Sequence, residues 1–323
     1  MNSFEWIDAH SVAEAVQLLG KSSVTVAKAG GMDLLDLMKE GLVKPARVVN
    51  LKTIADLDAI ERDANGNVRI GALATLAQIA RDPLLQKEFS ALTSAANHAA
   101  TPQVRNVATL GGNLLQRPRC WYLRNAHFER AQVSSAARQG ANHYHAIFDT
   151  ERSPLVHAST PATALLAYDA TVHVAGTPGS RSIPIREFFL PPDATRDRDV
   201  TIEPGEVLTH VTLPTLPANS VSAYHKQTER DSYDWPICDV AATATFNADG
   251  TIGTIAIALG WVAPTPMRAT AAEQLLVGKK LDETVATNAA RAVIRDAKPL
   301  TQNGYKVPVL ETVIRRTVLA LRV

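Results

Sequence analysis

Two short segments rich in glycine contain the residues best suited to chemistry in this chain. They are Lys28-Ala29-Gly30-Gly31-Met32-Asp33-Leu34-Leu35 and Val107-Ala108-Thr109-Leu110-Gly111-Gly112-Asn113-Leu114. Paired glycines carry no side chains, so backbone N–H groups can approach a ligand closely. Several such N–H groups around one hollow form a site for phosphate oxygens. Two loops about eighty residues apart therefore predict a ligand with two phosphates, held from both sides.

Neither glycine segment matches a common nucleotide-binding motif. The spacing differs from Gly-x-Gly-x-x-Gly and from Gly-x-x-x-x-Gly-Lys-Ser/Thr, which argues against a Rossmann site and a P-loop. A tight turn is the structural alternative for either Gly-Gly pair alone. A helix expected over residues 33–39 favours phosphate at the first segment. Asn113 could hydrogen-bond a ligand or cap the segment that follows it.

Length and composition describe an ordinary globular protein. The chain has 323 residues, of which 46% are hydrophobic and 20% charged, enough for two or three domains. A net charge of +1 and 5% aromatic residues give no indication of nucleic acid or an anionic membrane. We expect neither a secretory signal nor a membrane span. Two cysteines, Cys120 and Cys238, are too few to ligate an iron–sulfur cluster alone.

The first hundred residues predict alternating strands and helices. Ser11-Val12-Ala13-Glu14 is a capping box that opens a helix, and Gly20 closes it. Asn65-Gly66 predicts a hairpin turn. Strands are also expected over 23–27 and 47–50. Helices are expected over 33–39, from the residues after Thr75 to Ala80, and over 84–99.

Residues 117–154 show no clear period, and we interpret them as a long insertion or loop. His127, His143, His145 and His157 could bind a metal, but scattered imidazoles on a polar loop are the preferred interpretation. Cys120 is interpreted as a small hydrophobe rather than a reactive thiol. The run Arg196-Asp197-Arg198-Asp199 is expected to be a solvated turn.

Pro214 and Pro217 mark the expected boundary of a C-terminal domain. Strands are predicted over 221–226, 240–246 and 252–259. Thr270-Ala271-Ala272-Glu273 is expected to be a second capping box, and two further helices fit 282–298 and 308–321. Strands followed by helices indicate an α+β domain.

Four motifs taken together resemble one family. Ala29–Leu34, Arg69-Ile70-Gly71-Ala72, Arg105–Leu114 and Tyr224-His225-Lys226-Gln227 are similar to the FAD-binding subunit of molybdenum hydroxylases, the relatives of xanthine dehydrogenase, carbon monoxide dehydrogenase and aldehyde oxidoreductase. The likeness covers nearly the whole chain. The tract 112–120 most resembles the medium subunit of bacterial periplasmic aldehyde oxidoreductases.

This resemblance implies a fold and a set of partners. The fold class is α+β: a vanillyl-alcohol-oxidase-type (PCMH) FAD-binding fold in two subdomains, 1–57 and 58–217, followed by a C-terminal α+β domain, 218–323, with a three-stranded sheet and helices. The second subdomain carries the insertion 117–154. The implied partners are a molybdopterin-binding large subunit and a [2Fe-2S] small subunit. The implied location is cytoplasmic, or periplasmic if a partner carries a twin-arginine signal.

The resemblance also implies FAD-binding residues. The pyrophosphate would be surrounded by Ala27, Lys28, Ala29, Gly30, Gly31, Met32, Asp33 and Leu34. The second wall would be formed by Ala108, Thr109, Gly111, Gly112 and Asn113, with Leu115 near the flavin ring. Lys226 matches a lysine that lies near the flavin in this family. Ile202 is at the position where the family has an apolar residue in contact with the flavin ring. Ser159 and Thr160 match a Ser-Asp pair, so Thr160 removes a fixed negative charge.

One cofactor of the aldehyde oxidoreductase subgroup is not expected here. That subgroup holds a [4Fe-4S] cluster in the insertion through several cysteines, and only Cys120 matches one of them. We therefore expect no [4Fe-4S] cluster in this chain.

The implied function is electron transfer. Substrate would be hydroxylated at molybdenum on a partner, and electrons would pass from the partner's [2Fe-2S] clusters through FAD to an external acceptor, with no catalytic side chain on this chain. Two alternatives are a stand-alone FAD-dependent oxidase or reductase, and a structural subunit that has lost FAD.

Overall fold

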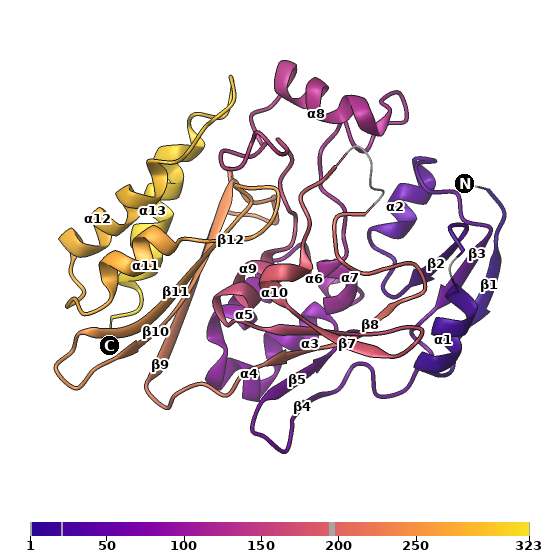
Figure 1. Ribbon diagram of the computed structural model, residues 1–323, viewed down its shortest axis with the longest axis horizontal. Coiled ribbons are helices and arrows are strands. Elements are labelled where there is room, and N and C mark those ends of the chain that lie inside the picture. Colours follow the sequence, from indigo (N-terminus) through magenta and orange to yellow (C-terminus); the bar gives the residue numbers. More distant parts are fainter. Residues whose placement is uncertain (1, 21, 194–197, 323) are drawn as a thin grey trace.

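Three sheets follow one another along the chain (Figure 1). The computed structural model describes residues 2–20, 22–193 and 198–322. The strand orders are β1-β3-β2, β4-β5-β8-β6-β7 and β12-β11-β10-β9. In Figure 1 the N-terminal sheet lies at the right and the C-terminal sheet at the left, with the five-stranded sheet between them.

The N-terminal sheet is parallel, with helices as its crossovers. It contains β1 (Glu5–Asp8), β2 (Thr25–Lys28) and β3 (Arg47–Asn50), connected through α1 (Val12–Leu19) and α2 (Leu34–Lys39). The predicted helix after Ser11 is confirmed, because the Ser11 side chain accepts a hydrogen bond from the Glu14 N–H. In a complete capping box the Glu14 carboxylate would accept from the Ser11 N–H. Here it accepts from the N–H of the preceding residue, His10.

The middle sheet is antiparallel. Its strands are β4 (Ile60–Arg62), β5 (Val68–Gly71), β6 (Thr171–Ala175), β7 (Ser180–Pro184) and β8 (Val207–Leu213). The predicted hairpin at Asn65-Gly66 is confirmed: Asp63 Oδ1 accepts from the N–H groups of Asn65 and Asn67, and Gly66 has a φ of 85°. Glycine reaches this left-handed conformation without strain.

Short helices accompany the middle sheet. They are α3 (Leu76–Arg81), α4 (Pro83–Glu88), α5 (Ser90–Asn97), α6 (Pro102–Arg105), α7 (Leu110–Leu114), α9 (Thr160–Ala167) and α10 (Ile185–Phe188). The single helix expected over 84–99 is therefore two helices. The break is at Phe89, whose φ of −128° and ψ of 49° are not helical. Its buried ring packs edge-to-face on Tyr168, with centroids 5.1 Å apart.

The stretch 117–154, interpreted from the sequence as a long insertion or loop, contains one helix among its described residues. Helix α8 (Arg130–Gln139) lies within it, at the top of Figure 1. Only Val133 and Ala137 of this helix are buried, four residues apart, and they pack with Cys120 and Leu155. Two buried apolar positions in ten residues, one of them an alanine, are too few to produce a clear helical period.

The C-terminal sheet is antiparallel and contains β9 (Ser220–Gln227), β10 (Cys238–Phe246), β11 (Ile252–Gly260) and β12 (Met267–Arg268). The three predicted strands are confirmed, and β12 adds a fourth of two residues. The helices are α11 (Thr270–Leu276), α12 (Glu283–Ile294) and α13 (Lys306–Leu319). The expected capping box at Thr270 is wrong, because Glu273 accepts from the Ile257 N–H and pairs with Arg268.

The C-terminal sheet is covered on both faces. Successive side chains of a strand point to opposite faces. Accordingly, Val240 and Ala242 pack in the cluster formed with α12 and α13, whereas Ala241 packs with the buried residues of α5 and α9. The C-terminal sheet and the middle part of the chain therefore share one continuous apolar contact.

Among the described residues, the search for a helix long and apolar enough to cross a membrane finds none.

Candidate functional site

The two glycine loops meet in the folded chain. A Cβ atom on Gly30 would lie 2.2 Å from the carbonyl oxygen of Val107, so any side chain there would push the loops apart. Gly31 has a φ of 78°, which strains other residues. Both loops line one cavity of about 440 Å³, a volume typical of small-molecule sites. Gly30 is therefore needed for contact between the two loops, and Gly31 for the backbone conformation of the first loop.

The first loop has backbone donors to offer. The N–H groups of residues 29–32, between β2 and α2, donate no backbone or side-chain hydrogen bond to any described residue. Consecutive open N–H groups form a concave cradle for anions such as phosphate. The loop therefore has the donor set that the sequence predicts for it.

The second loop differs from the expectation that its N–H groups would also be open. Gly111 donates to Ala72 O at 2.8 Å, Gly112 to Thr109 Oγ1 at 3.2 Å, and Asn113 to Thr109 O at 2.8 Å. These bonds form because Thr109 caps α7 and because this segment lies against Ala72. The second loop therefore contributes a side-chain-poor wall more than a set of donors.

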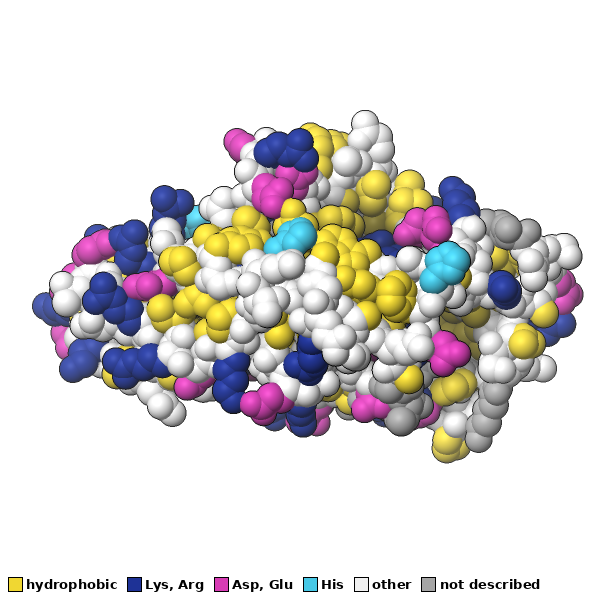
Figure 2. Space-filling model, turned by 90° about the horizontal axis from the view of Figure 1, so that it is seen from above, with side chains coloured by type: hydrophobic (Ala, Val, Ile, Leu, Met, Phe, Trp, Pro, Cys, Tyr) yellow, Lys and Arg dark blue, Asp and Glu magenta, His cyan; other side chains and the backbone are white. Residues whose placement is uncertain are grey.

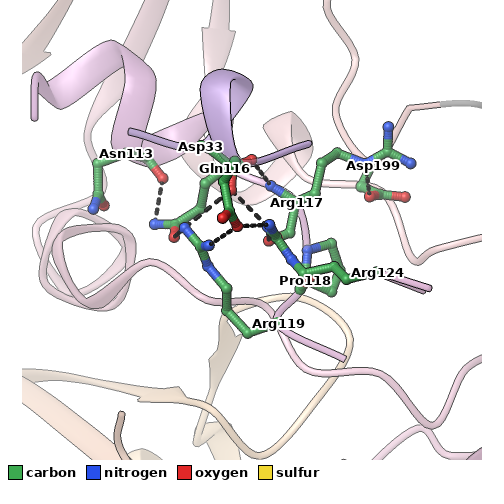
Figure 3. Close-up of polar contacts among 9 residues, drawn as sticks. Asp33, Asn113, Gln116, Arg117, Pro118, Arg119, Arg124 and Asp199 are labelled. Atoms are coloured by element: carbon green, nitrogen blue, oxygen red, sulfur yellow. Dashed lines mark hydrogen bonds and ion pairs between the residues drawn. The ribbon is translucent and has the colours of Figure 1, made fainter. Parts of the chain in front are cut away.

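Asp33 connects the first loop to the insertion (Figure 3). Its carboxylate accepts from Arg124 Nη2 at 2.6 Å and pairs with Arg119 Nη2 at 3.0 Å, and its other oxygen accepts from the Arg117 N–H at 2.9 Å. All of these partners follow the second loop in sequence. Asp33 lines the cavity, but its charge is matched by arginines, so it presents little repulsion to an anion there.

Two lysines line the same cavity. Lys28 lies at the end of β2, where its ammonium group is 5.1 Å from the centroid of the Trp6 ring. Lys226, on β9, donates to His98 O at 2.8 Å. Burial lowers the pKa of Lys226, and the carboxylates of Asp239 and Asp234 oppose this shift. The cavity thus has cations as well as backbone donors.

The remaining predicted residues divide into two groups. Thr160 lines the cavity, but its hydroxyl donates to Ala95 O at 3.2 Å. Ser159 and Ile202 do not line it. Ser159 is buried, caps α9, and donates to Asn113 Oδ1 at 2.5 Å, so it orients a lining residue. Ile202 packs against the middle apolar cluster. The other predicted residues all line the cavity: Ala27, Lys28, Ala29, Gly30, Gly31, Met32, Asp33, Leu34, Ala108, Thr109, Gly111, Gly112, Asn113, Leu115 and Lys226.

The sequence prediction missed several lining residues, among them Gln116, Arg117, Arg119 and Trp235. The two arginines shortly after the second loop are a signal that could have indicated Arg117 and Arg119. Asp199 was also misassigned to a solvated turn. It is 7% exposed and pairs with Arg117 at 2.9 Å and Arg130 at 2.8 Å. Arg196 and Asp197 lie outside the described residues.

A second cavity of about 430 Å³ adjoins the first and shares Arg119, Asp234, Trp235 and Pro236 with it. Cys120 and His145 line it, with Cys120 Sγ 3.2 Å from His145 Nε2. The interpretation of the histidines as scattered on a polar loop is wrong for His145 and His157, which are buried. Burial lowers the pKa of His145 to about 4 and raises that of the Cys120 thiol, so both groups are neutral near pH 7.

The first cavity fits a dinucleotide such as FAD in its chemistry. Open N–H groups and Lys28 can hold phosphate oxygens at one end. Leu115, Trp235 and Lys226 line other parts of the cavity. A flat, polar ring system needs both apolar and polar contacts.

Two family models match this chain. The first, described as the FAD binding domain in molybdopterin dehydrogenase, matches residues 2–216. The second, the CO dehydrogenase flavoprotein C-terminal domain, matches residues 223–321.

Similar proteins agree with these models. The aldehyde oxidoreductase FAD-binding subunit PaoB of Escherichia coli is 32% identical over 319 residues, 95% of this chain and 94% of that protein. The carbon monoxide dehydrogenase medium chain of Hydrogenophaga pseudoflava is 29% identical over 297 residues, 92% of this chain and 88% of that one. A solved structure of carbon monoxide dehydrogenase from Hydrogenophaga pseudoflava aligns with a TM-score of 0.78 at 27% identity, and covers 99% of this chain and 97% of that chain. The chain therefore belongs to the FAD-binding medium subunits of the molybdenum hydroxylase family.

Proposed function

We propose that this chain binds FAD in the first cavity and transfers electrons within a molybdenum-dependent aldehyde oxidoreductase. The observation that carries the proposal is the meeting of both glycine loops at one cavity, with four consecutive open N–H groups on the first. The aldehyde assignment draws its support from the 32% identity to PaoB over nearly the whole chain.

We assign the residues as follows. The N–H groups of residues 29–32 and the Lys28 ammonium group hold the diphosphate. Gly111 and Gly112 allow the cofactor to approach the second wall, and Lys226 lies near the flavin ring. Bound FAD supplies the chemistry of accepting electrons and passing them on. The chain's own groups bind the cofactor, orient it and place positive charge beside it.

The partners are proposed from the same relatives. A molybdopterin-binding subunit would oxidise the aldehyde, and a [2Fe-2S] subunit would deliver the electrons to this chain. An exposed apolar surface supports a role in a complex. Figure 2 shows hydrophobic side chains gathered across the middle of one face, while Lys and Arg side chains are more frequent at the end that carries the C-terminal helices.

We also propose that the three sheets correspond to the units 1–57, 58–217 and 218–323. Each sheet lies entirely within one of these ranges. The extensive packing of β9–β11 on α5 and α9 implies that the last two units form one rigid body around the cavity.

Two measurements test the function. The purified chain, stripped of cofactor, should take up one FAD per chain and gain the visible absorption of oxidised flavin. Purification from the native host should recover a molybdopterin subunit and a [2Fe-2S] subunit with it. A folded chain that takes up no FAD would instead favour a structural subunit. Aldehyde oxidation by the isolated FAD-loaded chain would favour a stand-alone oxidase.

A further inference from the structure

A carboxyl group is buried inside the C-terminal sheet. Asp239, on β10, is fully buried. Its Oδ2 accepts from the Tyr224 hydroxyl at 2.8 Å, and its Oδ1 accepts from the Thr163 hydroxyl at 3.1 Å. Gly260 on β11 leaves room for it, because a Cβ atom there would lie 1.9 Å from Asp239 Oδ1. Aspartate is almost never fully buried unless it is paired, so this carboxyl needs a partner of opposite charge.

The partner is a lysine of the first cavity. Asp239 lies directly opposite Lys226 in the antiparallel pairing of β10 with β9. Side chains at such positions share one face of the sheet, with Cβ atoms about 4.5–5.5 Å apart. Lys226 lines the first cavity and donates to His98 O at 2.8 Å. Lys226 therefore connects the buried carboxyl electrostatically to the cavity.

Burial and the lysine act on the carboxyl in opposite directions. Burial raises the pKa of Asp239 to about 7, although the two hydroxyl donors and Lys226 favour the charged form. Burial lowers the pKa of Lys226, and Asp239 opposes that shift. Near pH 7 Asp239 is therefore divided between its neutral and charged forms, and a change in nearby charge shifts its proton occupancy.

Two further charges act on Lys226. The Asp234 carboxylate raises the pKa of Lys226, and the Arg105 guanidinium, which donates to two backbone carbonyl oxygens, lowers it. Asp239 has the larger effect of the two carboxylates. The charge on Lys226 therefore depends chiefly on burial and on Asp239.

The other elements packed on β10 bring one histidine near this pair. Helix α9 contributes the neutral Thr163 hydroxyl, and α5 ends next to His98, whose ring centroid lies 6.3 Å from that of Tyr224. Lys306 of α13 acts on the Cys238 thiol, which packs on the opposite face of the sheet. His98 is therefore the other titratable group that an experiment must separate from Asp239.

We propose that Asp239 takes up a proton when negative charge is added to FAD in the first cavity, and that it acts on the cofactor through Lys226. The proposal rests on the proposed function, because it requires FAD in that cavity. Two electrons enter FAD from an external donor, and a proton from solvent binds to a carboxylate oxygen of Asp239. The positive charge of Lys226, no longer balanced by Asp239, then stabilises the charge added to the cofactor.

A route for the proton is present. The Tyr224 hydroxyl, which donates to Asp239, also interacts with the Thr160 side chain. Thr160 lines the first cavity. Hydroxyl groups both donate and accept hydrogen bonds, so these two side chains connect the buried carboxyl to the cavity.

Nuclear magnetic resonance of the chain without FAD tests the carboxyl itself. With ¹³C at the aspartate carboxyl carbons, one resonance should titrate near pH 7 and should be missing in Asp239→Asn. Asp249→Asn, in the exposed turn between β10 and β11, is the matched control and should leave that resonance in place. A folded chain in which no aspartate titrates above about pH 5 would overturn the proposal, whether or not FAD binds.

Potentiometric titration of the FAD-loaded chain tests the coupling. The slope of the FAD midpoint potential against pH gives the number of protons taken up per two electrons. Near pH 7 the wild-type chain and Asp249→Asn should take up a fraction of a proton more than Asp239→Asn. This excess should shrink towards about pH 5 and about pH 9, where Asp239 stays in one form. Equal slopes in the wild type and Asp239→Asn at pH 7 would overturn the proposal.

Two further variants keep the test decisive. His98→Gln should retain the excess, and its loss there but not in Asp239→Asn would assign the proton to His98 and contradict the proposal. If Asp239→Asn does not fold, Tyr224→Phe decides: it removes a donor that favours the charged carboxylate, so the excess should move to higher pH. An unmoved excess would count against Asp239. The FAD content of each sample is measured by absorption, so failure of FAD binding is detected separately.

Discussion

At Asp33, one carboxylate holds three groups of the segment that follows the second loop. The Asp33 side chain is 15% exposed, whereas that of Asp36, which contacts the same two arginines, is 51% exposed. Water screens the second set of contacts far more than the first. The first glycine loop should therefore owe its position against the insertion to Asp33.

Asp33→Asn is expected to lower the free energy of unfolding by about 1–3 kcal/mol, between the values for exposed and buried ion pairs. Asp36→Asn is the matched control and should cost less than about 1 kcal/mol. Urea denaturation of both variants measures the difference. Equal losses in the two variants would mean that Asp33 has no special role in holding the loop.

Lys306 is fully buried, and its ammonium group donates to backbone carbonyls only, those of Tyr144, His145 and Trp261. Burial lowers the pKa of Lys306 to about 7 from its usual 10.5, an effect opposed by Cys238. The pKa of Lys306 is lower in the folded chain than in the unfolded chain, so burial of this side chain carries no protonation cost above a pH of about 10.5. As the pH falls from there towards about 7, the unfolded chain binds the proton first, and the folded chain loses stability.

The wild-type chain should therefore gain stability relative to Lys306→Met as the pH rises from 7 to 9, by at most about 1.4 kcal/mol per pH unit. Guanidinium denaturation at several pH values measures this slope. Lys298→Met is the control, because Lys298 is exposed and pairs with Glu151. A difference between the wild type and Lys306→Met that does not vary with pH would show that Lys306 does not titrate in this range.

The two glycine loops bring the end of β2 against the segment that leads into α7. Gly30→Ala would place a methyl group 2.2 Å from Val107 O, so β2 and α7 would have to move apart. We expect a loss of roughly 1–3 kcal/mol in stability, typical of overpacking, and a much weaker affinity for FAD. Gly304→Ala is the control, since a Cβ there meets no atom within 4 Å. FAD titration of both variants checks this, and unchanged affinity in Gly30→Ala would refute it.

The sequence indicates elements best where one local rule determines the outcome. Ser11 caps α1, Asn65-Gly66 turns a hairpin, and three C-terminal strands have clear apolar patterns. The sequence is a poor guide where contacts between residues far apart in the chain determine the local structure. Helix α8 buries only Val133 and Ala137, and Asp199 is buried by pairing with arginines more than 65 residues away.

The candidate site shows the same division. Glycine pairs are visible in the sequence, and they do line one cavity. Which N–H groups stay open is not visible, because the donors of Gly111, Gly112 and Asn113 are taken by Ala72 and Thr109 only in the folded chain. The aromatic second cavity has no local signal either, since its rings come from positions 121 to 261.

We expect the chain as a whole to hold no iron–sulfur cluster. Cys120 packs under α8 and Cys238 in the C-terminal sheet, in separate clusters. Residues 2–20, 22–193 and 198–322 contain no group of three or more His, Cys, Asp or Glu side chains placed to hold a metal. The reduced, isolated chain should give no iron–sulfur signal in electron paramagnetic resonance. A stoichiometric [4Fe-4S] spectrum would refute this.

We propose that the two glycine loops together form one FAD site. Calorimetric titration of the cofactor-free chain with FAD tests this proposal. We predict saturation at one FAD per chain, with binding greatly weakened by Gly30→Ala and unchanged by Gly304→Ala. A folded wild-type chain that gives no binding heat and gains no flavin absorption would contradict the proposal.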